Sequence, residues 1–262
     1  MYNEYLEFAK NIAYKANEIM LKYYNCDKKS DYKNDNTIVT IADKKINNYL
    51  IKEVKVKYPN HSVDGEEESI GSSDYVWICD PIDGTAMYAR EIPVCVFSLA
   101  LSIKGKIVVG VVYDPFNDNM YYASLGNGAY KNDLKIHVNN YNLDDKESLV
   151  HYDMHPSFEY DIYDVIKELE KRTYIVSIGS VIRACMCIAE GNFNLAIFPG
   201  TIHKNCDIAA VKIIVEEAGG TVTDLFGNDQ RYDKNINGAI ISNGIVHNEV
   251  VDLIKEKIIN NK

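Results

Sequence analysis

The sequence predicts an α+β protein with at least one large antiparallel sheet, and three observations support this class. Apolar residues recur at steps of three and four through residues 2–24 and again from Ile46 to Val54, which indicates two amphipathic helices. Three apolar runs between residues 94 and 123 follow one another through short turns, and short turns join only antiparallel neighbours. Helical and strand patterns then alternate through the second half of the chain.

The two N-terminal helices are separated by a polar connector. The first carries Leu6, Ala9, Ala13, Ala16 and Met20 on one face, and we expect its role to be purely structural. The connector leads through 37–43 into the second helix, and Asp43 lies near the start of that helix. A carboxylate at this place is commonly a cap or a partner of the helix dipole.

A buried strand that ends in charge follows at residues 76–85, VWICDPIDGT. Because proline cannot continue a ladder, we expect the strand to stop at Pro81 and the chain to turn at Asp80. Asp80 and Asp83 lie three residues apart around this turn and, with the carbonyl of Ile82, offer the hard oxygen ligands that Mg²⁺ prefers.

The residues just after the second aspartate suit an anion. Gly84 allows close approach of the backbone to a ligand, and a short helix from Thr85 to Tyr88 would direct its free N–H groups at a phosphate. Metal and phosphate would then lie side by side.

The remaining elements are expected in a regular order. Strands at 94–101, 106–113 and 120–123 form a meander, with turns at 104–106, 126–128 and 131–133. The second half is expected to contain helices at 161–170, 180–190 and 206–218 and at the C-terminus, and strands at 173–177, 195–198, 221–224 and 239–242. We expect a single unit, 1–262, in which a polar stretch at 139–147 marks the boundary between subdomains of about 1–140 and 141–262.

Composition narrows the class of protein. The chain has 262 residues, 47% hydrophobic and 25% charged, which suits a globular protein with a large core. Its net charge of −10, without a basic stripe, argues against nucleic acid as a partner. No run of eighteen apolar residues occurs, and the N-terminus is acidic, so we expect a cytoplasmic protein without a membrane partner. Six scattered cysteines are expected to be reduced.

Four separated motifs together resemble the inositol monophosphatase superfamily of Mg²⁺-dependent phosphatases. They are VTIAD at 39–43, GEE at 65–67, DPIDGT at 80–85 and CDIAAVKIIVEEAGG at 206–220, and the likeness extends over essentially the whole chain. The resemblance implies the layered α-β-α-β-α sandwich of the inositol monophosphatase/fructose bisphosphatase type. It also implies a homodimer.

The resemblance assigns a role to each motif. Glu66, Asp80, Asp83, the Ile82 carbonyl and Asp207 would hold two or three Mg²⁺ ions. Asp43 and Thr85 would activate the attacking water together with the cation at Glu66. The backbone amides of Gly84, Thr85 and Ala86 would hold the phosphate in line. Two departures from the family pattern, Cys206 for the usual Trp and Val211 for the usual Gly, remove no oxygen ligand.

Three further residues are candidates for contact with the substrate. Lys33 falls near a lysine that reaches the phosphate in the family, although the alignment there is off by about one residue. Arg183 is either a surface residue or a second anion contact. His203 lies close to Asp207 and would touch the substrate without acting as a base.

The substrate is a small phosphate monoester, and inositol 1-phosphate is the first candidate. Inositol-specific relatives carry a glutamate shortly before the last motif, whereas 196–201 contains no acid. Fructose-1,6-bisphosphatase and 3′(2′),5′-bisphosphate nucleotidase of the same superfamily are therefore kept as alternatives. A different class, an inactive member that acts as a binding or regulatory protein, is disfavoured because every residue of the implied site is present.

Overall fold

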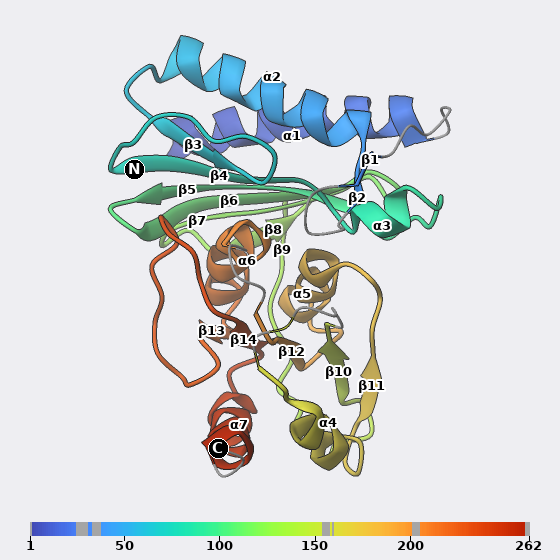
Figure 1. Ribbon diagram of the computed structural model, residues 1–262. Coiled ribbons are helices and arrows are strands. Elements are labelled where there is room, and N and C mark those ends of the chain that lie inside the picture. The colour runs from blue at the N-terminus through green and yellow to red at the C-terminus, as the bar shows by residue number, and fades with distance from the viewer. Residues whose placement is uncertain are drawn as a thin grey trace.

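The computed structural model describes residues 2–24, 31, 32, 38–153, 158, 160–200 and 205–259, and it has five layers (Figure 1). Two helices cover one face of a large sheet, two more helices lie between that sheet and a smaller one, and a last pair covers the outer face of the smaller sheet. The predicted α-β-α-β-α sandwich is therefore confirmed.

The first two layers come from the N-terminal half. The outer helices are α1 (Asn3–Tyr24) and α2 (Ile41–Lys57), and the large sheet has the order β3-β4-β5-β6-β7-β8-β9. Among the described strands of this large sheet, only β3 and β4 pair in parallel, and the other neighbours are antiparallel as predicted. The strands are β3 (Ser62–Gly65), β4 (Tyr75–Asp83), β5 (Val96–Ile103), β6 (Lys106–Asp114), β7 (Asn119–Ser124), β8 (Ala129–Lys131) and β9 (Leu134–Lys135).

The remaining layers come from the C-terminal half. Helices α5 (Val181–Ala189) and α6 (Cys206–Glu217) form the middle layer, and α4 (Tyr163–Leu169) and α7 (His247–Ile259) form the last one. The smaller sheet has the order β11-β10-β12-β14-β13. Its strands are β10 (Leu149–Tyr152), β11 (Tyr174–Val176), β12 (Leu195–Phe198), β13 (Thr221–Thr223) and β14 (Ala239–Ser242), and the chain also has a short α3 (Thr85–Tyr88) and a pair β1 (Asp31–Tyr32) and β2 (Ile38–Val39).

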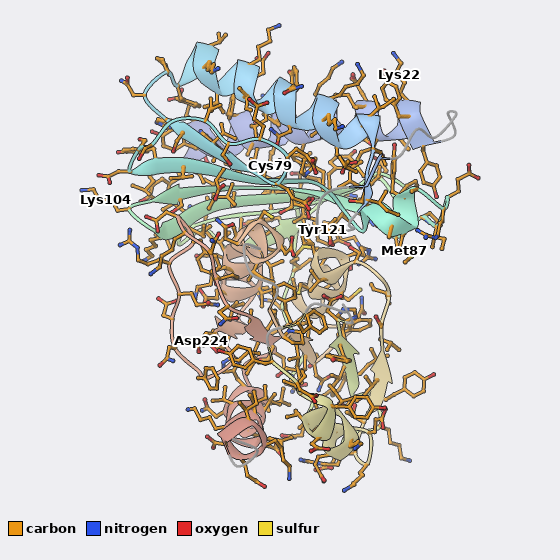
Figure 2. All side chains as sticks on the ribbon, viewed as in Figure 1. Lys22, Cys79, Met87, Lys104, Tyr121 and Asp224 are labelled. Atoms are coloured by element: carbon orange, nitrogen blue, oxygen red, sulfur yellow. The ribbon has the colours of Figure 1, made fainter. Side chains whose placement is uncertain are left out.

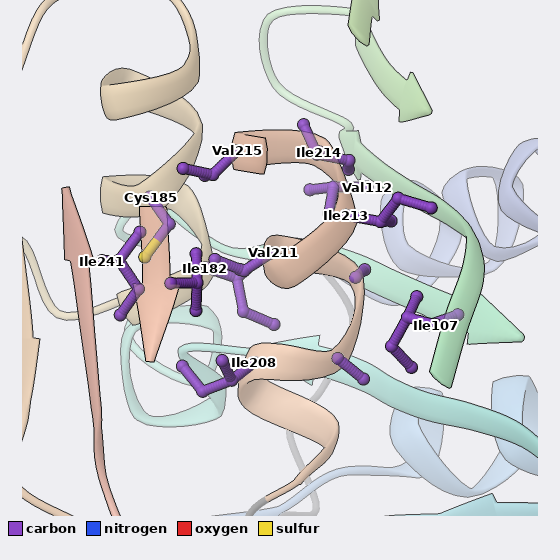
Figure 3. Packing of buried hydrophobic residues seen from close by; sticks show 14 of the residues in the cluster. Ile107, Val112, Ile182, Cys185, Ile208, Val211, Ile213, Ile214, Val215 and Ile241 are labelled. Carbon is purple, nitrogen blue, oxygen red and sulfur yellow. The ribbon is translucent and has the colours of Figure 1, made fainter. Parts of the chain in front are cut away.

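The two halves share one interior. The cluster between the sheets contains Ile107 and Val112 from the large sheet, Ile182 from α5 and Ile208 from α6 (Figure 3). Helix α6 packs so closely on β6 that a Cβ at Gly110 would lie 2.6 Å from the Cγ2 atom of Ile213. The second half therefore packs directly onto the large sheet, and the division into subdomains near residue 140 remains a prediction.

Side chains between the layers are buried, and those on the outside are exposed. Cys79 and Tyr121 are fully buried, whereas Lys22 and Lys104 project from the surface (Figure 2). Within the described part of the chain, the five cysteines 79, 95, 185, 187 and 206 form no disulfide, and their reduced state remains a prediction. Among the same residues, no helix combines the length and the apolar character that crossing a bilayer requires.

One prediction about the strands is wrong. The strand was expected to stop at Pro81, but β4 continues to Asp83. The pairing with β5 is interrupted between Asp80 and Asp83, where the register shifts. Such an irregularity leaves residues out of the ladder, and a proline without an N–H is tolerated there.

Strand β10 was not predicted. Its sequence, LVHY, is short and includes the polar His151, so it shows neither a clean alternation nor a long apolar run. Tertiary structure makes it a strand, because it pairs in parallel with β11 on one side and with β12 on the other.

His151 is a buried histidine whose ring nitrogens have no hydrogen-bond partner among the described residues. Burial lowers the pKa of His151 to about 4. Since this pKa lies below the value of 6.5 in the unfolded chain, the folded protein is expected to lose stability as the pH falls from about 6.5 towards 4.

A His151→Leu variant is therefore expected to melt at a higher temperature than the wild type, with a gain that grows between pH 7.5 and pH 5. Thermal unfolding at both pH values, with the exposed His137→Gln as control, measures this. An equal or smaller gain at pH 5 would contradict the assignment.

Candidate functional site

Parallel pairing of β3 and β4 brings the first two acids together. Gly65 is aligned with Cys79, and the N–H of Glu66 donates to the carbonyl of Cys79 at 3.0 Å. The next residue on each strand is an acid, Glu66 and Asp80. Glu66 is half-buried, Asp80 is buried, and Glu68 is exposed.

The end of β4 is irregular between the two aspartates. Asp80 is aligned with Ser98 of β5 and Asp83 with Val96, with the register shift between them. The N–H of Ile82 donates to Oδ1 of Asp80 at 2.9 Å, which holds this carboxylate against its own strand.

Gly84 forms the corner between β4 and α3. It has φ +84°, a conformation that favours glycine, and a Cβ there would lie 3.0 Å from the carbonyl oxygen of Gly179. Helix α3 starts at Thr85, as predicted. The first N–H groups of a helix have no acceptor within it, so the amides of Thr85 and Ala86 suit an anion.

Asp43 is fully buried in the first turn of α2. It forms a capping box with Thr40, whose hydroxyl and N–H donate to Oδ2 of Asp43 at 2.5 and 2.8 Å. Burial raises the pKa of Asp43 to about 7; the bonds from Thr40 act in the opposite direction, and the charges of Glu66 and Glu67 raise it further. Asp43 is therefore both a helix cap and a neighbour of the GEE bend.

The implied pair of Asp43 and Thr85 has other contacts in this structure. Asp43 is bonded to Thr40, and the hydroxyl of Thr85 donates to the carbonyl of Ile82 at 2.8 Å. A direct hydrogen bond between these two described residues is not among their contacts. Their joint role in activating water remains a prediction.

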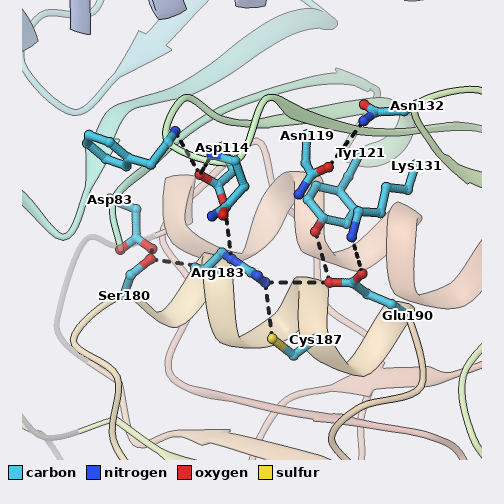
Figure 4. A network of polar contacts seen from close by, with 12 residues as sticks. Asp83, Asp114, Asn119, Tyr121, Lys131, Asn132, Ser180, Arg183, Cys187 and Glu190 are labelled. Carbon is cyan, nitrogen blue, oxygen red and sulfur yellow. Dashed lines mark hydrogen bonds and ion pairs between the residues drawn. The ribbon is translucent and has the colours of Figure 1, made fainter. Parts of the chain in front are cut away.

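Asp83 connects β4 to the second half of the chain. Its Oδ2 accepts hydrogen bonds from the hydroxyl of Ser180 and from the N–H of Ile182, the latter at 2.8 Å, at the start of α5 (Figure 4). Burial raises the pKa of Asp83 to about 7, and the charge of Asp207 raises it further, against the effect of these bonds. Asp207 is buried in the first turn of α6.

Cys95 is a buried cysteine whose pKa is affected by both Asp43 and Asp83. Burial raises its pKa to about 12, and the charges of Asp83 and, to a smaller extent, Asp43 contribute. The charges of carboxylates on both α2 and β4 therefore act on one buried thiol.

The candidate carboxylates are suitable ligands for a cation, but their side chains do not converge on one point. Asp43 has a buried Oδ1 without a hydrogen-bond partner among the described residues. Asp43 and Asp83 both have raised pKa values, which repulsion between carboxylates helps to produce. Within the described ranges, however, no three His, Cys, Asp or Glu side chains converge closely enough to hold a metal ion. The ligand set Glu66, Asp80, Ile82, Asp83 and Asp207 stays a prediction.

Asn47 belongs to the site but was not singled out from the sequence. It lies four residues after Asp43 on α2, and its Nδ2 donates to the carbonyl of Glu68 at 3.0 Å. A Cβ at Gly65 would lie 2.1 Å from Oδ1 of Asn47. Helix α2 thus holds the GEE bend through one side chain, and the i, i+4 spacing from Asp43 is the signal that could have found it.

Arg183 is tied into a polar network rather than exposed. Its Nε lies 3.1 Å from Oδ2 of Asp114, its Nη1 is 3.0 Å from Sγ of Cys187 and 3.6 Å from Oε1 of Glu190 (Figure 4). Glu190 in turn binds Tyr121 and is paired with a lysine of β8. The network holds α5 against the large sheet, and a contact of Arg183 with substrate remains a prediction. Lys33 and His203 lie outside the described residues.

The buried Asp43 predicts a dependence of stability on pH when metal is removed. Because its folded pKa is raised from 3.8 to about 7, its contribution to stability is complete below about 3.8 and is lost as the pH rises through about 7. In EDTA at pH 8, Asp43→Asn is expected to melt above the wild type, and this advantage should shrink towards pH 4. Melting curves across this range measure it, and an advantage independent of pH would contradict the assignment.

The comparisons with known proteins find similar sequences and solved structures over most of the chain. The sequence model of the inositol monophosphatase family matches residues 1–258. A Thermotoga maritima protein named fructose-1,6-bisphosphatase/inositol-1-monophosphatase is 31% identical over 260 residues, 97% of this chain and 96% of that protein. A Neisseria meningitidis protein named putative Nus factor SuhB is 32% identical, over 87% of this chain and 89% of its own. The solved structure of the Thermotoga maritima IMPase superposes with a TM-score of 0.86 at 28% identity and covers 98% of this chain and 99% of its own.

Proposed function

Since the chain belongs to the inositol monophosphatase family, we propose that it is a Mg²⁺-dependent phosphatase of small phosphate monoesters, with inositol 1-phosphate as the first candidate substrate. The observation that supports the proposal is the parallel pairing of β3 and β4, which brings Glu66 and Asp80, from two of the four motifs, to neighbouring positions. The name of the Thermotoga relative supports both an inositol and a fructose ester.

The residues of this chain would divide the work. Glu66, Asp80, Asp83 and Asp207, with the carbonyl of Ile82, would hold Mg²⁺. When bound, the cations would offset the charge of the phosphate and of the leaving oxygen. The amides after Gly84 would orient the phosphate.

Asp43 would hold the proton taken from the attacking water. Its pKa of about 7 suits a base that works near neutral pH, and Thr40 fixes the orientation of its carboxylate. Neighbouring cations would lower this pKa, so the base would be ionised when the site is loaded.

A regulatory role is the second candidate, and the SuhB-named relative is the observation that favours it. A protein that kept the fold without the activity would not need these carboxylates. All of the implied carboxylates are present in this chain, so hydrolysis is the better-supported function.

Phosphate release with and without Mg²⁺ tests the proposal. Inositol 1-phosphate, fructose 1,6-bisphosphate and adenosine 3′,5′-bisphosphate should be compared by kcat/KM. We expect Mg²⁺-dependent hydrolysis with the highest value for inositol 1-phosphate. Absence of turnover on all three esters, at any Mg²⁺ concentration, would favour the regulatory role. Cytoplasmic location and a homodimer remain predictions, and sedimentation analysis checks the second.

A further inference from the structure

A cavity of about 570 Å³ lies beside the hairpin that joins β5 to β6. Its walls come from this hairpin at 104–107, from Leu125 directly after β7, from the second half of α6, from β13 and from the segment 227–232. Binding sites for small molecules typically have volumes of about 300–1,000 Å³. The cavity is therefore large enough for a small organic molecule.

This cavity is remote from the acids of the candidate functional site. Asp83 is aligned with Val96 at the start of β5, whereas the hairpin at 104–106 follows the end of β5. At about 3.3 Å per residue, the 8 residues of β5 span about 25 Å. Lys104 and Met87, a residue of α3, accordingly lie at opposite ends of the large sheet (Figure 2). The cavity is a separate feature of the molecule.

Three cationic side chains gather at the hairpin. Lys104 and Lys106 line the cavity, and Arg231 packs against the glycine between them, since a Cβ at Gly105 would lie 2.6 Å from Nε of Arg231. Asp233 neutralises Arg231, with 2.5 Å between Oδ2 and Nη2. Within the part of the chain that the structure describes, the ammonium groups of Lys104 and Lys106 take part in no hydrogen bond or ion pair.

The acids of the cavity wall already have partners. Nζ of Lys212 lies 2.8 Å from Oε1 of Glu216 and 2.7 Å from Oδ1 of Asp229. The two carboxylate oxygens of Glu217 accept hydrogen bonds from two glycine amides of the turn at 126–128, each at 2.6 Å. The wall therefore leaves the positive charge of the two hairpin lysines available to an anion.

Tyr232 adds an unused hydrogen-bond donor to the wall. Its side chain is 1% exposed, and its hydroxyl has no hydrogen-bond partner among the described residues. Burial raises the pKa of Tyr232, and the charges of Glu216 and Asp229 raise it further, so the phenol stays protonated. A buried hydroxyl without a partner costs free energy, and a ligand that accepts its hydrogen bond removes this cost.

We propose that this cavity is a binding site for a small organic anion. Its charged group pairs with Lys104 and Lys106, and its apolar body carries an acceptor for the hydroxyl of Tyr232. The apolar side chains of the wall contact that body; they are Ile107, Leu125, Ile213 and Val222. The inference goes beyond the proposed phosphatase function and does not rest on it, because the cavity shares no residue with the candidate site.

Three benzene derivatives test the assignment in titrations of the full chain in EDTA, measured by ligand-observed NMR. 4-Acetylbenzoate has the charge, the apolar ring and the acceptor, 4-ethylbenzoate lacks the acceptor, and 4-acetylbenzyl alcohol lacks the charge. Without cations, the acids of the candidate site repel both benzoates. We expect 4-acetylbenzoate to bind with a Kd about 3- to 10-fold below that of 4-ethylbenzoate and at least about 10-fold below that of the alcohol.

Two variants locate the binding. Lys104→Gln/Lys106→Gln is expected to raise the Kd of 4-acetylbenzoate at least about 10-fold, and Tyr232→Phe is expected to abolish the difference between the two benzoates. Lys52→Gln/Lys55→Gln makes the same change of charge on the exposed side of α2 and is the matched control, with a change of less than about twofold. If melting curves show that Tyr232→Phe does not fold, the two benzoates compared on the wild type carry the test of the acceptor.

The result that would overturn the assignment is also specific. Equal affinity for 4-acetylbenzoate in Lys104→Gln/Lys106→Gln and in the control would place the binding elsewhere. No saturable binding of 4-acetylbenzoate to the wild type, or a preference for it over 4-ethylbenzoate that persists in Tyr232→Phe, would be equally contrary. Each of these outcomes leaves the proposed function standing, because none of them measures phosphate release.

Discussion

Asp83→Asn is expected to lose turnover by a factor on the order of 10³ while it keeps its fold. The amide has the shape of the carboxylate, and its oxygen can still accept the bonds that Ser180 and Ile182 donate to Asp83. The variant removes the negative charge of residue 83, which together with that of Asp207 would bind a shared cation. Phosphate release from inositol 1-phosphate and a melting curve, each with and without Mg²⁺, measure the two effects.

The control for this variant is Asp252→Asn on the exposed face of α7, which should be active. We also expect Mg²⁺ to raise the melting temperature of the wild type more than that of Asp83→Asn, because ligand binding stabilises only the state that binds it. A fully active Asp83→Asn protein would mean that the metal assignment is wrong.

Gly65→Ala is expected to raise the Mg²⁺ concentration needed for half-maximal activity at least about 10-fold and to lower the melting temperature by several degrees. The new Cβ would lie 2.1 Å from Oδ1 of Asn47 and 2.7 Å from the carbonyl oxygen of Glu68. Because one of these atoms belongs to the backbone, the bend that carries Glu66 must shift, and overpacking of this kind typically costs about 1–3 kcal/mol.

Gly126→Ala is the matched glycine control. Its φ of +81° makes an alanine strained, but a Cβ there has nothing within 4 Å. This variant should lose some stability and keep the Mg²⁺ dependence of the wild type. If Gly65→Ala also kept that dependence, the contact with Asn47 would have no part in positioning Glu66.

The regular elements were predictable because each depends on local pattern. Helix α3 and strand β12 have the predicted bounds, and the hairpin at Lys104 and Gly105 occurs where the turn residues indicated. Pro81 was misjudged because a proline blocks only regular pairing, and the shift of register that accommodates it arises from the partner strand. Strand β10 was missed because four residues with a central histidine show no period.

The candidate site was predictable residue by residue but not as an arrangement. Glu66 and Asp80 become neighbours through parallel pairing of strands separated in the chain by a loop. Asp83 gains Ser180 and Asp207 from elements about a hundred residues away. Arg183, read from sequence as either surface or anion contact, instead pairs with Asp114.

By itself, the sequence determined the fold class, most of the elements in their order and the motifs of a phosphatase family, because periodicity and short motifs are local properties of a chain. Only the tertiary structure decided which groups share an environment. Asn47 at the GEE bend, Asp83 bonded to the start of α5, and His151 without a hydrogen-bond partner among the described residues all depend on strands and helices that meet from distant parts of the chain. Burial and electrostatic repulsion depend on distance in space, and no spacing along the sequence specifies that distance.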